Sequence, residues 1–155
     1  MRKRCCFAGH SKLYDMDGIY AHLLQLVEKL IVEEGVSEFW VGNYGNFDWL
    51  SAKAVRTLKE KYPNIQLNLV IPYLTSNINA DKDFYSKKYD YILMADIPEK
   101  TPKKFQILKC NEHMVNNSDF LVCYVEYSWG GAAKTVAYAK RKQHIQIWHV
   151  PGNET

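Results

Sequence analysis

The clearest structural signal in this chain is the run Phe120-Leu121-Val122-Cys123-Tyr124-Val125-Glu126-Tyr127-Ser128-Trp129-Gly130-Gly131-Ala132-Ala133-Lys134. Its first six residues are apolar, as in a strand buried on both faces, and a helical pattern starts after the paired glycines. Such a turn lets the backbone approach an anion closely, and the free N–H groups of the first helical turn point toward it. The motif predicts a phosphate cradle, although the same turn can also be a plain strand-to-helix connection.

Outward from this motif, strand and helix patterns alternate along the chain. Strands are expected at residues 5–8, 38–41, 65–71, 91–94, 120–125 and 145–148. Helices are expected from near Asp17 to Gly35, over 105–116 and after the paired glycines, with a helical turn near Asp83. A further helix is expected to carry Leu50, Ala54, Val55 and Leu58 and to end before Pro63. This alternation predicts an α/β, Rossmann-like fold with a mostly parallel sheet flanked by helices on both faces. The length predicts a single domain over residues 1–155.

The topology also predicts where a ligand binds. Right-handed crossovers place the strand-to-helix loops at the carboxyl edge of the sheet, where open α/β sheets bind ligands. Three of these loops carry glycines: Gly9-His10-Ser11, Gly42 to Asp48, and Trp129 to Lys134. We therefore expect Ala8, Val41, Met94 and Val125 near strand ends at one edge, with a ligand site where the three loops meet.

Within that site, we expect the backbone of the glycine turn to hold an anion, with Thr135 or Ser11 adding a hydroxyl donor. The expected ligand residues in the loops are Gly9, His10, Ser11, Gly42, Asn43, Gly45, Asp48, Trp129, Gly130, Gly131, Ala132, Ala133 and Thr135. Tyr44, Trp49 and Trp129 lie in or beside these loops, where a ligand ring could stack on one of them.

Three side chains are candidates for catalysis, and each also has a structural interpretation. Asp48 could act as a base or cap the following helix. Glu126 could reach a ligand or be an exposed loop acid. His10 could donate to a phosphate, act as an acid, or be a polar loop residue.

Composition narrows the function classes. Hydrophobic residues make up 47% of the 155 residues and charged residues 24%, as in ordinary globular domains. The net charge of +3 is small, and no basic stripe is interleaved with aromatic residues, which argues against a nucleic-acid partner. The apolar run after Met1-Arg2-Lys3-Arg4 is too short for a signal peptide or a membrane span, so we expect a cytoplasmic protein with no membrane partner.

The four cysteines indicate neither a metal site nor a disulfide framework. No CxxC spacing occurs, and no metal ion is expected. Cys5 and Cys6 are adjacent in an expected strand, so their side chains should face opposite sides of the sheet. Buried free thiols are the simpler interpretation.

Four segments occur in an order and spacing that resemble a known family. They are Phe7-Ala8-Gly9-His10, Gly42 to Trp49, Asn111 with Met114 to Asp119, and Gly130 to Ala139. Together they are similar to the YpsA-like branch of the SLOG superfamily, which also contains the DprA and LOG proteins. The resemblance spans nearly the whole chain. It implies a Rossmann-like fold that binds nucleotides or nucleotide-derived ligands at the three loops, with Asn111 as a further ligand residue, and a homodimer or higher homo-oligomer.

The chain departs from the LOG enzymes, which cleave the N-glycosidic bond of nucleoside monophosphates. Those enzymes carry a glutamate shortly after their Gly-Gly-x-Gly-Thr, whereas Lys134 to Tyr138 contains no carboxylate. The arginine that usually precedes the Asn111 position is Cys110 here. Because glycosidic cleavage needs a carboxylate and usually a cation for the phosphate, we expect no LOG-type activity.

Three function classes follow. We expect a sensor or carrier module that binds a nucleotide or nucleotide-derived small molecule; no other cofactor is identified. The alternative is a nucleotide-processing hydrolase or transferase that acts on the glycosidic or phosphate bond. A nucleic-acid-associated protein similar to DprA is the third class, although the charge pattern argues against it.

Overall fold

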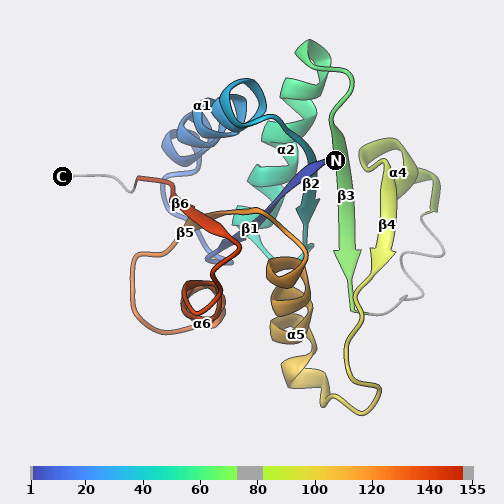
Figure 1. The fold of residues 1–155 in the computed structure, drawn as a ribbon, viewed down its shortest axis with the longest axis vertical. Helices are drawn as coiled ribbons and strands as arrows, with labels where there is room; N and C mark the ends of the chain where they lie inside the picture. Colours follow the sequence, from blue (N-terminus) through green and yellow to red (C-terminus); the bar gives the residue numbers. More distant parts are fainter. Residues whose placement is uncertain (1, 73–81, 152–155) are drawn as a thin grey trace.

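The computed structural model describes residues 2–72 and 82–151, which form a six-stranded sheet and its covering helices (Figure 1). The strands are β1 (Lys3–Gly9), β2 (Val36–Val41), β3 (Gln66–Ile71), β4 (Tyr91–Met94), β5 (Phe120–Tyr124) and β6 (Gln146–His149). The helices are α1 (Met16–Glu34), α2 (Asn46–Lys61), α4 (Lys82–Lys88), α5 (Lys103–Asn116) and α6 (Gly131–Lys140). Every strand pair is parallel, in the order β4-β3-β2-β1-β5-β6. The expected α/β, Rossmann-like architecture is confirmed.

Two apolar cores lie on the two faces of the sheet. On one face, Cys5 and Phe7 of β1 pack with the buried sides of α1 and α2. On the other face, Cys6 and Ala8 pack with α5 and α6. Figure 1 shows the two helix pairs on opposite sides of the strands. The alternation along β1 confirms that the two adjacent thiols face opposite sides.

Local chemistry sets the helix ends. The helix α1 starts at Met16, next to Asp17 as expected, because the Asp15 carboxylate accepts the Gly18 N–H at 3.2 Å. Its last residue is Glu34, and the following Gly35, with a left-handed φ of 73°, stops the helix as expected. The helical turn expected near Asp83 belongs to α4, and residues 73–81 of the preceding polar stretch lie outside the described residues.

The chain order reverses between two central strands. From β1 the chain continues through β2, β3 and β4 on one side, whereas β5 and β6 lie on the other side. The loops after β1, β2 and β5 therefore meet at the carboxyl edge beside the switch point, where ligands of open α/β sheets bind. The expected placement of Ala8, Val41, Met94 and Val125 at or next to strand ends of this edge is confirmed. Among the described residues, no helix is both long and apolar enough to cross a membrane.

Candidate functional site

The three glycine-bearing loops enclose a cavity of about 300 Å³ at the switch point, hereafter the three-loop cavity. Its lining residues are Gly9, His10, Ser11, Tyr44, Asp48, Ile107, Asn111, Tyr127, Trp129, Gly130, Gly131 and Ala132. The structure thus brings together nine of the residues that we expected to contact a ligand, and α5 contributes a further wall.

Five expected ligand residues do not line the cavity: Gly42, Asn43, Gly45, Ala133 and Thr135. Gly45 packs against the first loop, where the Asn46 N–H donates to the Ser11 carbonyl at 2.9 Å. Thr135 is buried, and its hydroxyl donates to the Gly131 carbonyl at 2.9 Å. Of the two hydroxyls that we considered for an anion, the structure therefore places only Ser11 at the cavity.

The cavity is also lined by three residues that are not among the expected ligand residues: Ile107, Tyr127 and Tyr44. Of these, only Tyr44 is a residue on which we expected a ligand ring to stack. Ile107 lies four residues before Asn111 on α5, so helical spacing from Asn111 would have indicated it. Tyr127 precedes Gly130 by three residues in the same loop, and the sequence motif alone did not show that its ring turns inward.

Three aromatic rings form a stack that runs from the interior to the surface. The centroids of His10 and Tyr127 are 3.9 Å apart at an interplanar angle of 13°. Those of Tyr127 and Trp129 are 4.1 Å apart at 26°. Exposure rises along this aromatic stack (His10, Tyr127, Trp129) from 5% through 37% to 68%. Trp129 therefore presents an exposed ring on a support fixed by the two rings behind it.

His10 anchors the buried end of the aromatic stack. Its Nε2 accepts the Glu126 N–H at 2.9 Å, so the neutral ring carries its proton on Nδ1. Burial lowers the pKa of His10, and the Glu126 carboxylate opposes this shift only in part. The Nε2 atom thus holds the loop in place, which leaves the Nδ1–H as the ring's donor.

Asp48 is a carboxylate in the wall of the cavity. It lies in the first turn of α2, and its Oδ2 accepts the Tyr44 N–H at 3.1 Å, which ties the second loop to the helix. Burial raises the pKa of Asp48 to about 6, against a smaller opposing effect of the Tyr44 hydrogen bond. Glu126, by contrast, is exposed, accepts a hydrogen bond from the Tyr124 hydroxyl and does not line the cavity.

The paired glycines form the N-terminus of α6. Gly130 is the N-cap with a φ of 95°, and no side chain in the described part of the chain caps the helix. Its carbonyl accepts the Lys134 N–H at 3.0 Å, so the N–H groups of residues 131–133 precede the first intrahelical bond. A Cβ built on Gly131 would meet no atom within 4 Å. The positive end of the helix therefore opens onto free space at the cavity.

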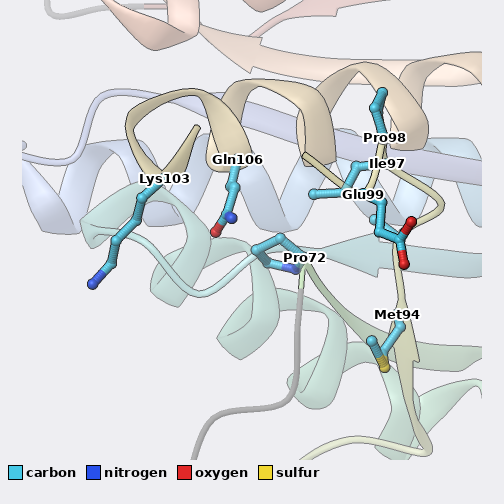
Figure 2. A pocket seen from close by; sticks show the side chains of 8 residues that line it. Pro72, Met94, Ile97, Pro98, Glu99, Lys103 and Gln106 are labelled. Carbon is cyan, nitrogen blue, oxygen red and sulfur yellow. The ribbon is translucent and has the colours of Figure 1, made fainter. Parts of the chain in front are cut away.

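A larger cavity of about 450 Å³ lies at the ends of β3 and β4. Figure 2 shows Gln106 directed toward Pro72, with Met94, Ile97 and Glu99 around the same space and Lys103 directed outward. None of the expected ligand residues lines it. This cavity is larger than the three-loop cavity, but the glycine turn, the aromatic stack and the carboxylate gather at the smaller one, which we take as the candidate site.

Solved structures share the fold. The chain aligns with DNA processing protein A (DprA) from Streptococcus pneumoniae at a TM-score of 0.72 and 13% identity, over 98% of this chain and 51% of that one. It aligns with DprA from Helicobacter pylori at a TM-score of 0.67 and 14% identity, over 97% of this chain and 66% of that one. The chain thus spans about half of the first protein and just under two thirds of the second.

This likeness corrects our expectation against a nucleic-acid partner. The Helicobacter pylori structure is described as showing a single-stranded DNA binding mode. The same fold therefore serves a protein that binds a nucleic-acid strand, and the argument from charge was wrong. Its physical weakness is that a whole-chain net charge does not report the local stacking and backbone groups that hold single strands.

Relatives in sequence point to the same family. The chain is 29% identical to a UPF0398 protein of Halalkalibacterium halodurans, over 77% of this chain and 67% of that protein. It is 26% identical to the SPbeta prophage-derived protein YoqJ of Bacillus subtilis, over 83% of this chain and 84% of that protein. A family model described as the YspA SLOG family (YpsA) matches residues 11–150. Because that match spans most of the sequence, the chain belongs to the YpsA family of the SLOG superfamily, as its motifs indicated.

Proposed function

We propose that the chain binds a nucleotide or nucleotide-derived small molecule in the three-loop cavity, as a sensor or carrier module. One observation carries the proposal: the exposed ring of Trp129 stands directly before the uncapped, open N-terminus of α6. A nucleotide joins an aromatic ring to a phosphate, so its two recognisable parts match two neighbouring features of one loop.

The phosphate fits the end of α6. A helix N-terminus carries roughly half a positive charge, and its free N–H groups donate to anions. The missing side chain at Gly131 leaves room for phosphate oxygens to approach the backbone. Among the described residues, no lysine or arginine lines the three-loop cavity, so the backbone would supply the positive field. We therefore expect phosphate binding to depend on Gly131 more than on any basic side chain.

The base fits the outer face of Trp129. Stacking of a base on an aromatic side chain is worth about 1–3 kcal/mol, and it tolerates different bases. The rings behind Trp129 hold it in place before a ligand arrives, which reduces the entropy cost of binding. The volume of about 300 Å³ is at the lower end for ligand pockets and suits a mononucleotide better than a dinucleotide.

Calorimetric titration with AMP and adenosine tests the proposal. Wild type should bind AMP at least tenfold more tightly than adenosine, because only AMP offers an anion to α6. Gly131→Asp should abolish AMP binding through bulk and negative charge, yet fold, since φ at this position is not positive and a Cβ has space. Ala137→Asp adds the same charge at an exposed position further along α6 and should bind like wild type. If Gly131→Asp folds and binds AMP normally, the glycine turn only connects β5 to α6 and does not bind the phosphate.

A single nucleic-acid strand is the second candidate ligand. Exposed aromatic residues stand on all three loops of the carboxyl edge or directly after them: Tyr14 is 93% exposed, Trp49 51% and Trp129 68%. Successive bases can stack on such a series, and the fold is shared with a protein that binds single-stranded DNA. Fluorescence anisotropy with labelled oligo-dT should then show binding that weakens between about 50 and 200 mM salt. Loss of strand binding in Trp49→Ala, with AMP binding kept, would separate this ligand from the mononucleotide.

Turnover would favour the hydrolase or transferase alternative. Asp48 is the carboxylate that lines the cavity, so it would have to activate the water. Chromatography of AMP incubated with the protein should show no free adenine. Release of adenine that disappears in Asp48→Asn would replace the binding module with an enzyme.

A further inference from the structure

The three-loop cavity has two electrically different ends. The third loop supplies the positive N-terminus of α6, and the second loop supplies Asp48 from the first turn of α2. Among the described residues that line the cavity, Asp48 is the one carboxylate, and its field is not offset by a lining lysine or arginine. A phosphate is attracted to the first end and repelled by the second, so the charges fix the direction in which a nucleotide can enter.

The Asp48 carboxylate is built into this position. A Cβ on Gly42 would lie 3.0 Å from Oδ2, so the glycine makes room for the carboxylate. The Tyr44 N–H then holds the same oxygen at 3.1 Å. A carboxylate offers about four lone-pair sites, so one bond to Tyr44 leaves capacity for further donors. A half-buried carboxylate in a cavity is best satisfied by neutral hydrogen-bond donors of the ligand.

We propose that Asp48 accepts hydrogen bonds from the sugar hydroxyls of the bound nucleotide, which makes the site selective for ribonucleotides over deoxyribonucleotides. The inference rests on the proposed function. The sugar is joined to both the phosphate and the base, so anchoring those groups at Gly131 and Trp129 places the sugar between them. Its hydroxyls are then the nearest neutral donors that can face the opposite wall, where Asp48 stands.

Selectivity follows from the cost of an unsatisfied carboxylate. A deoxyribonucleotide would cover Asp48 without supplying the 2′-hydroxyl, and hydrogen bonds to charged groups are among the stronger ones in proteins. We expect AMP to bind roughly tenfold or more tightly than 2′-deoxy-AMP. The exocyclic amino group of adenine is the other neutral donor, and inosine monophosphate, which lacks it, serves to separate the two.

Calorimetry with AMP, 2′-deoxy-AMP and inosine monophosphate tests the inference on the wild-type protein. Affinity should fall for 2′-deoxy-AMP and stay within about twofold for inosine monophosphate. In Asp48→Asn, the amide oxygen can keep the Tyr44 bond, but any bond of the neutral amide to a sugar hydroxyl is weaker than the bond of a carboxylate, so the preference for AMP over 2′-deoxy-AMP should shrink. Circular dichroism checks that this variant folds, and the comparison of ligands on wild type stands without it.

The outcomes separate the two proposals. Equal binding of AMP and 2′-deoxy-AMP by wild type would overturn the role of Asp48 and leave nucleotide binding intact. A loss for inosine monophosphate in place of 2′-deoxy-AMP would also overturn it, by assigning the carboxylate to the base. Failure of all three nucleotides to bind would overturn the proposed function, and this inference with it.

Discussion

Glycines occur in the three loops around the cavity for two opposite reasons. A Cβ on Gly9 would lie 2.2 Å from Cγ of the fully buried Phe47, and one on Gly45 would lie 2.4 Å from the Ser11 Cα. A Cβ on Gly131 would meet nothing within 4 Å. Gly9 and Gly45, in the first two loops, therefore allow close packing between segments of the protein. Gly131, in the third loop, leaves its backbone accessible to a ligand. Glycine content alone therefore does not identify a ligand site. The useful observation is whether the space that a side chain would fill is occupied by protein or is open.

The largest expected effect is on stability, from the matched pair Gly9→Ala and Gly131→Ala. Neither glycine has a positive φ, so the two substitutions differ mainly in packing. Overlap with Phe47 should lower the free energy of unfolding by about 3 kcal/mol in Gly9→Ala. Gly131→Ala should raise it by about 0.4–1 kcal/mol, because alanine restricts the unfolded chain. Urea unfolding measures both, and changes of the same sign and size would remove the distinction.

Trp129→Ala tests the third loop, where we propose that a base stacks on the exposed ring. We expect AMP affinity to fall about tenfold through loss of stacking, with little change in stability, because the ring is 68% exposed. Trp49→Ala is the matched control, since Trp49 is also exposed and does not line the cavity. Calorimetric titration of both variants gives the answer. An equal loss in the two variants would point to a general effect of surface tryptophans.

The pH dependence of stability tests the burial of Asp48, which lies on the second loop's side of the cavity. Because burial raises its folded-state pKa from 3.8 to about 6, its favourable contribution is present below pH 3.8 and is lost as the pH rises through about 6. The stability of wild type relative to Asp48→Asn should therefore fall between about pH 4 and 6 and level off above. We expect about 1 kcal/mol, since partial exposure keeps the effect below the roughly 3 kcal/mol of a fully buried group. Urea unfolding of both proteins across this range is the measurement, and a difference that rises with pH would contradict the assignment.

The smallest expected effect comes from the larger cavity at β3 and β4. Lys103→Glu and Met94→Ala alter its lining, and neither should change AMP affinity by more than about twofold, because the proposed phosphate and base sites lie on another loop. The same titrations measure this. A loss comparable to that of Trp129→Ala would show that size, and not the open glycine, marks the ligand site.

Much of the fold could be predicted because its signals are local. Apolar periodicity indicated the strands and helices, and Gly35 and Pro63 marked where helices stop. The meeting of the three loops at one edge followed from the handedness of parallel crossovers. The structure adds the residue that caps the first helix, Asp15 before α1.

The interior of the site was less predictable because it depends on contacts between distant segments. Only the structure shows that Phe47 fills the space beside Gly9, that Ile107 reaches the cavity from α5, and that the Glu126 N–H occupies one nitrogen of His10. Contacts within one helix matter too: the position of Thr135 near the glycine turn suggested an anion donor, and in the structure its hydroxyl donates to the Gly131 carbonyl of the same helix.

The buried cysteines make this protein convenient for labelling. All four thiols are buried, and burial raises the pKa of Cys6, Cys110 and Cys123 to about 12 and that of Cys5 well above its ordinary value. Thiolates are the reactive form, so maleimides should modify these residues only when the sheet opens. A single cysteine introduced at the exposed Ser128 would then accept a fluorophore beside Trp129 without removal of any native cysteine. The rate at which the native thiols are modified would report how often the core opens.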